Sequence, residues 1–93
     1  MLMGIRNVAF TDHAWEDFLY WEETDKRTFR KIKSLVKDAI RNPFEGEGKV
    51  EKLKGAHNQD LFSRRINDKD RLVYEVLNDR ILIYQMKGHY TDK

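Results

Sequence analysis

The sequence predicts an α+β domain in which two N-terminal helices pack on one face of a mainly antiparallel sheet. Three observations predict it. A short strand-like segment spans residues 5–10, two segments of helical periodicity follow, and four strand-like segments separated by short polar stretches complete the chain. A chain of 93 residues with 40% hydrophobic content can enclose one modest core. We therefore expect residues 1–93 to form a single domain with the order β-α-α-β-β-β-β.

The first helix is expected to begin at Thr11 or Asp12, since both residue types cap helix N-termini. Trp15, Phe18 and Leu19 then recur at helical spacing. We expect this stripe to face the core.

The second helix has the clearest period in the sequence. It is expected to open near Thr24 or Asp25 and to stop at Asn42, because Pro43 disfavours a helical residue before it. Its apolar side comprises Phe29, Ile32, Val36, Ala39 and Ile40, and its basic side comprises Lys26, Arg30, Lys33, Lys37 and Arg41. The apolar side should pack on the sheet, which leaves the basic side available to a partner.

The later strands are expected at residues 50–53, 61–66, 71–76 and 80–87, with a loop at 55–60. The last three strands are separated by turns short enough for antiparallel hairpins.

Alternation along these strands divides the side chains between two faces of the sheet. The face toward the helices is expected to hold Phe62, Ile66, Leu72, Tyr74 and Val76, and the open face Ser63, Arg65, Arg71 and Val73. Two arginines on an open sheet surface would make a phosphate clamp. Arg64 interrupts the apolar pattern, so it is expected at the sheet margin or in a structural ion pair.

Charge is unevenly distributed, although the net charge is only +2. Residues 1–25 hold one arginine against six acidic residues, whereas residues 26–54 hold ten basic residues against four acidic ones. A basic middle segment suits a polyanion such as nucleic acid. A solvated helix face is the alternative explanation.

Other features exclude several classes of protein. The chain has no cysteine and no apolar run long enough for a membrane span, and it does not open with a signal segment. We expect a cytoplasmic protein with no membrane partner. The three histidines, His13, His57 and His89, lack metal-ligand spacing, so neither a metal site nor a cofactor is expected.

Several motifs in this order and spacing resemble the YoeB toxins of the RelE/ParE superfamily. They are WEDFLYW at 15–21, ETDKR at 23–27, NPFEG at 42–46, GKVEKLK at 48–54, SRRI at 63–66, RLVY at 71–74 and HY at 89–90. The resemblance covers residues 8–90. It implies a RelE-like fold, metal-independent cleavage of messenger RNA in the ribosomal A site, a homodimer, and neutralisation by a YefM-type antitoxin.

The resemblance also implies roles for single residues. Glu51 matches the general base, Arg71 the arginine that stabilises the phosphate transition state, and Arg65 a second phosphate contact. His89 and Tyr90 match the terminal pair that includes the general acid. Lys49 is a weaker candidate for phosphate contact, and Lys33, Lys37 and Arg41 are weak candidates for docking on the ribosome or RNA.

The chemistry is consistent with these residue types. RNA carries its own nucleophile, the ribose 2′-hydroxyl, so cleavage without a metal needs a base, an acid for the leaving 5′-oxygen, and cations around the phosphorane. Each residue also has a structural alternative: a strand glutamate is often solvated, and paired arginines often form ion pairs.

The sequence departs from the family at four points, which include an altered loop at residues 55–60 and extra N-terminal residues. Val50 stands where well-known relatives have proline, and residues 91–93 extend beyond Tyr90. Two alternatives stay open: a ParE-like toxin that binds DNA gyrase without cutting RNA, and a non-catalytic binder of RNA or the ribosome.

Overall fold

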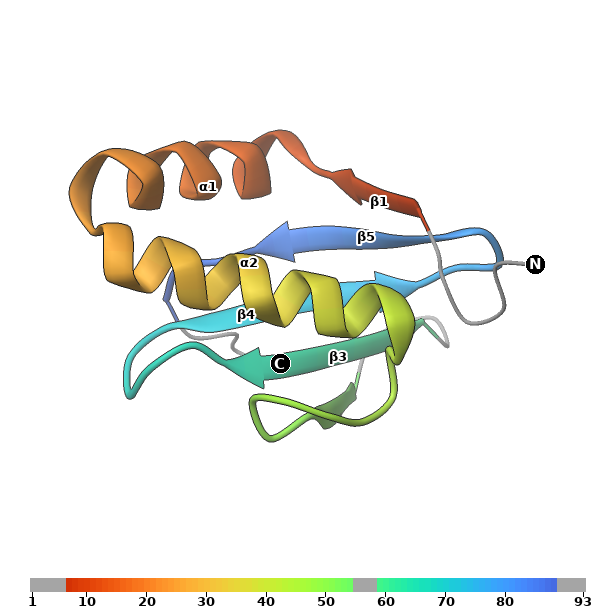
Figure 1. Cartoon of the computed structure of the whole chain (residues 1–93). Helices are drawn as coiled ribbons and strands as arrows, with labels where there is room; N and C mark the ends of the chain where they lie inside the picture. The colour runs from red at the N-terminus through yellow and green to blue at the C-terminus, as the bar shows by residue number, and fades with distance from the viewer. Residues whose placement is uncertain (1–6, 55–58, 89–93) are drawn as a thin grey trace.

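The computed structural model describes residues 7–54 and 59–88 of the chain. Its elements follow the expected order (Figure 1): β1 (Asn7–Phe10), α1 (Asp12–Thr24), α2 (Lys26–Arg41), β2 (Glu51–Lys54), β3 (Asp60–Arg65), β4 (Arg71–Val76) and β5 (Arg80–Gln85). The expected boundaries differ from these by one or two residues. Residues 5 and 6 of the expected first strand lie outside the described residues.

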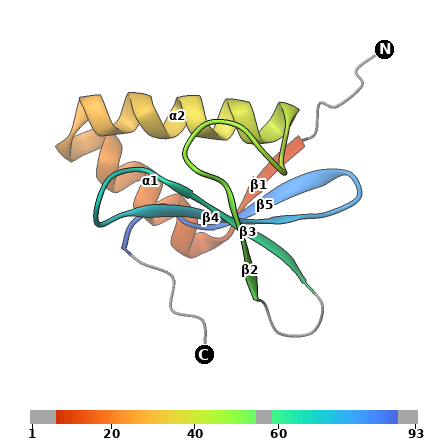
Figure 2. The same ribbon diagram turned by 90° about the horizontal axis from the view of Figure 1, so that it is seen from below.

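The five strands form one sheet in the order β1-β5-β4-β3-β2. Strands β2 to β5 pair antiparallel with their neighbours, whereas β1 pairs with β5 in parallel. Helix α2 lies over one side of this sheet (Figure 2), and α1 contributes Ala14 and Trp21 to the same core. The predicted α+β architecture is therefore confirmed, and the sheet is mixed because β1 returns to pair with the last strand.

Side-chain caps explain where the helices begin. Thr11 Oγ1 accepts a hydrogen bond from the backbone N–H of Ala14 (3.1 Å), and Asp25 Oδ1 accepts one from the N–H of Thr28 (3.1 Å). Each bond satisfies a backbone donor that has no partner within its helix. Helix α2 ends at Arg41 with Asn42 as its C-cap, as the following proline predicts.

The core lies between the helices and the sheet face that carries the even-numbered residues of β3 and β4 and the odd-numbered residues of β5. Helix α2 contributes Ile32, Leu35 and Ala39, all with at most 2% of their surface exposed. The sheet contributes Phe62, Ile66, Leu72, Tyr74, Ile81 and Ile83, with Val76 packed against them. The predicted buried face is thus confirmed.

The expected core stripe of α1 is wrong at Trp15, whereas Phe18 packs against the core as predicted. Trp15 is 46% exposed, and the buried residues of this helix are Ala14, Asp17 and Trp21. The reason is a polar contact with the end of β5. Asp17 Oδ2 accepts the N–H of Met86 (2.9 Å), and Trp21 Nε1 donates to the Met86 carbonyl (2.8 Å). Buried backbone groups need such partners, and they fix which side of α1 faces inward.

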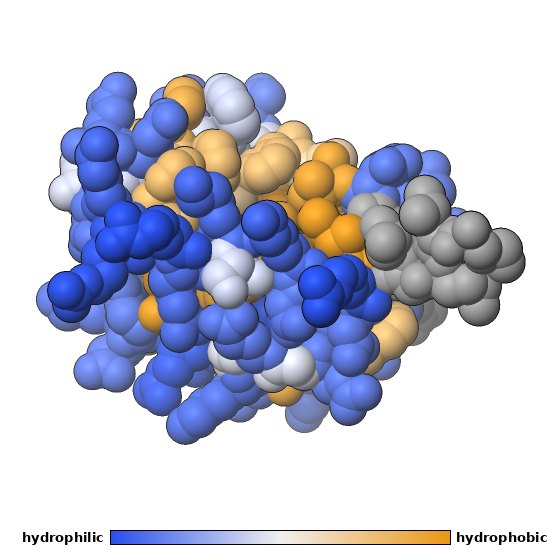
Figure 3. Space-filling view, viewed as in Figure 1, coloured by the Kyte–Doolittle hydropathy of each residue, from blue (hydrophilic) through white to orange (hydrophobic). Residues whose placement is uncertain are grey.

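The displaced Trp15 belongs to a partly exposed aromatic row. Phe10 and Phe18 meet edge to face, Trp15 stacks on Phe18, and Phe18 reaches Phe29 of α2 at a centroid distance of 4.9 Å. We call these four residues the aromatic row. In Figure 3 a band of hydrophobic side chains lies beside the hydrophilic side chains that cover α2.

Arg64 follows the strand alternation and is buried beneath α2, not at the sheet margin. Its side chain is fully buried, and Nη1 contacts Asp38 Oδ2 at 2.6 Å. The expected structural ion pair is therefore confirmed. Nε donates to the Tyr74 hydroxyl (3.0 Å), and the two Nη atoms donate to the carbonyls of Asn42, Glu45 and Glu47.

This contact holds the loop between α2 and β2 onto the sheet. The Glu47 N–H and the Arg64 guanidinium lower the pKa of Asp38, while burial raises the pKa of Tyr74. All the bonding directions of the buried guanidinium are thus occupied by loop, helix and sheet.

Candidate active site

The predicted general base and the predicted phosphate-contacting residues meet where β3 ends and β4 begins. We call Lys49, Glu51, Arg65 and Arg71 the strand-end site. Arg65 and Arg71 face each other across the β3–β4 hairpin. Glu51 opens β2, where it pairs with Ser63, the residue two before Arg65. Strand pairing therefore gathers three predicted site residues on the sheet face away from the helices.

Lys49 reaches the same place through a tight turn. The Gly48 carbonyl accepts the N–H of Arg65 (2.6 Å), which ties the turn to the end of β3. Gly48 has φ +92°, and an added Cβ would lie 2.9 Å from Leu35 Cδ2 and 3.1 Å from Arg64 Cβ. A side chain at this position would therefore push the turn away from the sheet.

Glu51 and Arg71 form the central contact of the site. Arg71 Nη1 lies 3.3 Å from Glu51 Oε1 and 3.4 Å from Ser63 Oγ. The Glu51 side chain is 63% exposed and that of Arg71 is 27% exposed. A carboxylate open to solvent beside a partly buried guanidinium can take a proton from a group that the guanidinium orients.

Among the described residues, the Arg65 side chain has one weak ion-pair partner. Its Nη2 lies 3.9 Å from Asp68, a side chain that is 98% exposed. An ion pair this long and this exposed contributes little free energy, so it does little to fix the Arg65 side chain in place. Within the strand-end site itself, the cations Lys49, Arg65 and Arg71 outnumber the single carboxylate of Glu51, which suits a phosphate.

The expected open face is not open along its whole length. Ser63 and Val73 are fully buried, so that expectation is wrong at these two positions. The Arg71 side chain lies against Ser63, and Val73 pairs with Gln85 at a β-bulge. Ser63 and Val73 have short side chains that longer neighbouring side chains cover. Strand alternation predicts which face a residue is on, but not whether its neighbours cover it. Of the four residues expected on the open face, Arg65 and Arg71 keep exposed surface, and Glu51 is exposed beside them.

His89 and Tyr90, the predicted acid pair, lie outside the described residues, as does His57. The residue before His89 is placed: the Gly88 carbonyl accepts the backbone N–H of Arg71 (3.0 Å). The chain is therefore held beside Arg71 at the point where it enters the terminal pair. Sequence reasoning named Arg71 but missed this backbone contact and the contact with Ser63, because neither leaves a motif.

The candidate docking residues lie apart from the strand-end site. Lys33, Lys37 and Arg41 are exposed on α2, which packs on the opposite face of the sheet. Lys33 Nζ lies 4.6 Å above the ring of Phe29. In Figure 3 hydrophilic side chains cover this helix. The basic side of α2 is thus exposed among the described residues, but it is not joined to the strand-end site, and its docking role stays a prediction.

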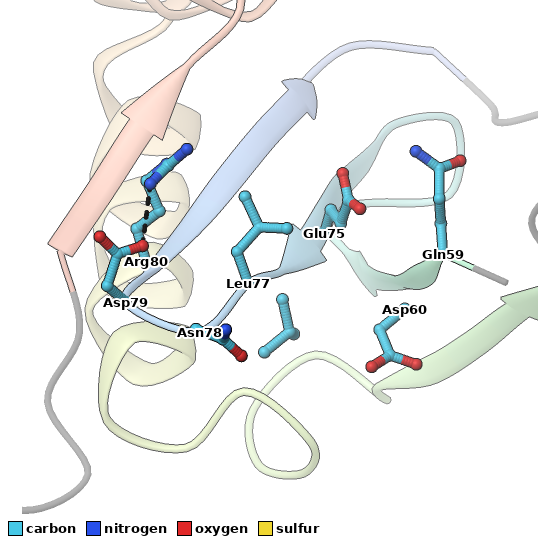
Figure 4. Close-up of a pocket in the computed structure, with 8 residues that line it drawn as sticks. Gln59, Asp60, Glu75, Leu77, Asn78, Asp79 and Arg80 are labelled. Atoms are coloured by element: carbon cyan, nitrogen blue, oxygen red, sulfur yellow. Dashed lines mark hydrogen bonds and ion pairs between the residues drawn. The ribbon is translucent and has the colours of Figure 1, made fainter. Parts of the chain in front are cut away.

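A separate hollow lies at the other end of the sheet, where β3 begins and β4 ends (Figure 4). It encloses about 470 Å³, and its lining includes the carboxylates of Asp60, Glu75 and Asp79. Arg80 in the same lining is paired with Asp79 at 2.8 Å. An acidic hollow disfavours a polyanion, so it does not compete with the strand-end site for RNA.

Residues 7–54 and 59–88 contain neither a metal-binding cluster nor a membrane-spanning helix. No group of three or more histidine, aspartate or glutamate side chains lies close enough to hold a metal ion. Neither helix of the described chain has the length and apolar character that crossing a membrane requires.

The layers and sheet order define a protein with the RelE-like fold. A RelE–RelB complex from Pyrococcus horikoshii OT3 shares it at a TM-score of 0.71, with 24% identity over 92% of this chain and 96% of that chain. This likeness establishes the fold.

Closer relatives establish the family. The YoeB dimer from Staphylococcus aureus matches with a TM-score of 0.83 and 43% identity, over 91% of this chain and 98% of that chain. A heterotetrameric YoeB–YefM toxin–antitoxin complex from the same organism matches with a TM-score of 0.80 and 43% identity, with the same coverage of both chains. Toxin YoeB of Escherichia coli K12 is 51% identical over 84 residues, which are 89% of this chain and 98% of that protein.

The family described as YoeB-like toxin of bacterial type II toxin–antitoxin systems matches residues 10–90. The chain therefore belongs to the YoeB-like toxin family.

Proposed function

We propose that the chain is a ribosome-dependent endoribonuclease that cuts messenger RNA in the ribosomal A site without a metal and so stops translation. The observation that carries the proposal is the contact between Glu51 and Arg71 at 3.3 Å, on an accessible rim with Arg65 across the hairpin. A base, a transition-state cation and a ground-state phosphate contact are the protein groups that 2′-hydroxyl attack requires.

Each residue has one role in the proposed reaction. Glu51 takes the proton of the 2′-hydroxyl, whose oxygen attacks the adjacent phosphorus. Arg71 stabilises the charge that develops on the phosphorane, and Arg65 and Lys49 bind the phosphate before reaction. The His89–Tyr90 pair supplies the proton to the leaving 5′-oxygen. The upstream fragment then ends in a 2′,3′-cyclic phosphate.

The product end tests this mechanism. On programmed ribosomes, mass spectrometry of the upstream fragment should find a 2′,3′-cyclic phosphate or the 3′-phosphate formed from it. A single 2′-deoxy nucleotide at the scissile position should block cleavage, while RNA binding survives because the phosphate contacts do not use that hydroxyl. A metal-bound water as nucleophile would leave a 3′-hydroxyl instead, and that result would overturn the proposal.

Arg71 should matter more than any lysine of α2. Replacing Arg71 with alanine should reduce kcat by about 10²- to 10³-fold, the range for losing a preorganised group that meets transition-state charge. Replacing Lys33 or Lys37, which are exposed on the opposite helical layer, should instead weaken binding in a salt-dependent way. Single-turnover cleavage at two salt concentrations separates the two effects. Equal losses of kcat from both kinds of variant would contradict the assignment.

We also propose that the chain forms a homodimer and binds a YefM-type antitoxin in the cytoplasm. The family's dimer and its YoeB–YefM complex support this assembly. The aromatic row gives a second copy an apolar surface, since Trp15 is 46% exposed. Light scattering of the purified chain should report a dimer, and Trp15→Ser should shift it toward monomer. A wild-type chain that is monomeric throughout would exclude the dimer.

A further inference from the structure

Gly88 is the last described residue before the proposed acid pair, and both of its backbone polar groups are bonded. Its N–H donates to Asp70 Oδ1 at 2.7 Å. Its carbonyl accepts from the backbone N–H of Arg71 (3.0 Å) and from Gln85 Nε2 (3.0 Å). Gly88 also has φ +84°, a conformation that strand pairing alone does not impose. Three neighbouring residues thus fix one peptide segment.

The Asp70 carboxylate is not needed by the turn in which it stands. Asn67 Oδ1 closes that turn, since it accepts the backbone N–H groups of Lys69 and Asp70 at 2.8 Å each. The Asp70 backbone carbonyl accepts the N–H of Ile66 at 2.9 Å. Within the described part of the chain, the hydrogen bond of the Asp70 side chain goes to Gly88. The carboxylate therefore serves the end of the chain and not its own hairpin.

The residues just before Gly88 are also held, from the opposite side. The backbone of Met86 is bonded to Asp17 and Trp21 of α1, both through buried contacts. Lys87 Nζ lies 4.4 Å above the ring of Tyr20. Residues 86–88 consequently run between α1 and the start of β4 with contacts on both sides.

We propose that Asp70 is a positioning residue of the cleavage site: by accepting the Gly88 N–H, it sets the place from which the chain continues into His89. The inference rests on the proposed function, in which the terminal pair supplies the general acid. Arg71 links the two halves of the site, because its backbone holds Gly88 while its side chain contacts Glu51. Asp70 fixes the other side of the same peptide segment. Misplacing a reacting group by about 1 Å can cost about 10²-fold in rate.

Three variants of the full chain test the role of Asp70. Asp70→Ala removes the acceptor, whereas Asp70→Asn keeps an oxygen at the same position and loses only the charge. Asn67→Ala is the matched control, because it breaks two hydrogen bonds of the same turn and leaves those of Gly88 in place. Thermal unfolding shows what each change does to the fold.

The readouts are kcat and KM on programmed ribosomes, together with hydrogen exchange of the Gly88 amide. Asp70→Ala should lower kcat by about 10- to 10²-fold with KM unchanged, and Gly88 should exchange faster. Asp70→Asn should keep most of the wild-type kcat and most of the protection of the Gly88 amide from exchange. Asn67→Ala should lower the Tm but not kcat. Should Asp70→Ala fail to fold, Gln85→Ala removes the side-chain donor to the Gly88 carbonyl and should show the same loss of kcat to a smaller degree.

The outcomes separate this inference from the proposed function. Cleavage by Asp70→Ala at the wild-type rate, or equal losses in Asp70→Asn and Asp70→Ala, would overturn the positioning role. So would an equal loss of kcat in Asn67→Ala. A wild-type chain that does not cut RNA would overturn the proposed function instead, and Gly88 exchange would still report whether Asp70 holds the peptide.

Discussion

Replacing Arg64 with alanine should lower the free energy of unfolding by about 3 kcal/mol, which is a large part of the roughly 5–15 kcal/mol of a typical small domain. The guanidinium is fully buried, and its loss leaves three loop carbonyls without that donor and leaves Asp38 with only the Glu47 N–H among its described donors. The loss falls at the lower end of the range for a broken buried pair, because the Asp38 side chain keeps 29% of its surface exposed to water. Urea unfolding followed by circular dichroism measures the change.

The adjacent arginine is the matched control. Arg65 has a 43% exposed side chain and a partner at 3.9 Å that is almost fully exposed, so Arg65→Ala should leave the unfolding midpoint nearly unchanged. Arg65→Ala should nevertheless weaken cleavage through its phosphate contact. Unchanged stability in Arg64→Ala would show that the loop between α2 and β2 does not depend on this contact.

Replacing Glu51 with glutamine should reduce cleavage by about 10²- to 10⁴-fold, the usual contribution of a general base. The substitution keeps the shape of the side chain and removes the basic oxygen. The fold should be unaffected, because the Glu51 side chain is 63% exposed and its pair with Arg71 lies at the surface. Single-turnover cleavage on programmed ribosomes measures the loss, and binding to the same ribosomes should persist.

Glu16→Gln is a suitable control, since it makes the same chemical change at an exposed position of α1. Full activity in Glu51→Gln would remove Glu51 from the mechanism. If that variant also stopped growth without any RNA cut, the gyrase-directed alternative would become the better hypothesis.

Local pattern was sufficient to predict the elements and most of the sheet's two faces. The period of α2 identified its apolar side, although Leu35 at its centre was not among the residues chosen. Alternation placed Phe62 and Tyr74 in the core and put Arg65 opposite Arg71. Each of these relations joins residues that are close in sequence or connected by a short hairpin, which is where periodicity carries information.

Contacts between distant segments could not be predicted in the same way. The inward side of α1 depends on Met86, 65 residues beyond Trp21, so the aromatic spacing of α1 gave the wrong register for Trp15. Arg64 was visible as an interruption, but its carbonyl partners belong to a loop without periodicity. The same holds for Asp70 and Gly88, whose hydrogen bond joins a turn to the end of a strand.

The parallel pairing of β1 with β5 has a consequence for how the protein is made. Asn7 faces Arg80 in the register, so β1 cannot pair until β5, which follows all the other elements of the domain, has been synthesised. Asp17 and Trp21 likewise acquire their partner only when Met86 has been added. Contacts of such wide sequence separation close late and slowly. A nascent chain that still lacks β5 therefore cannot yet hold Gly88 beside Arg71, so this part of the site forms only after the rest of the sheet has been synthesised.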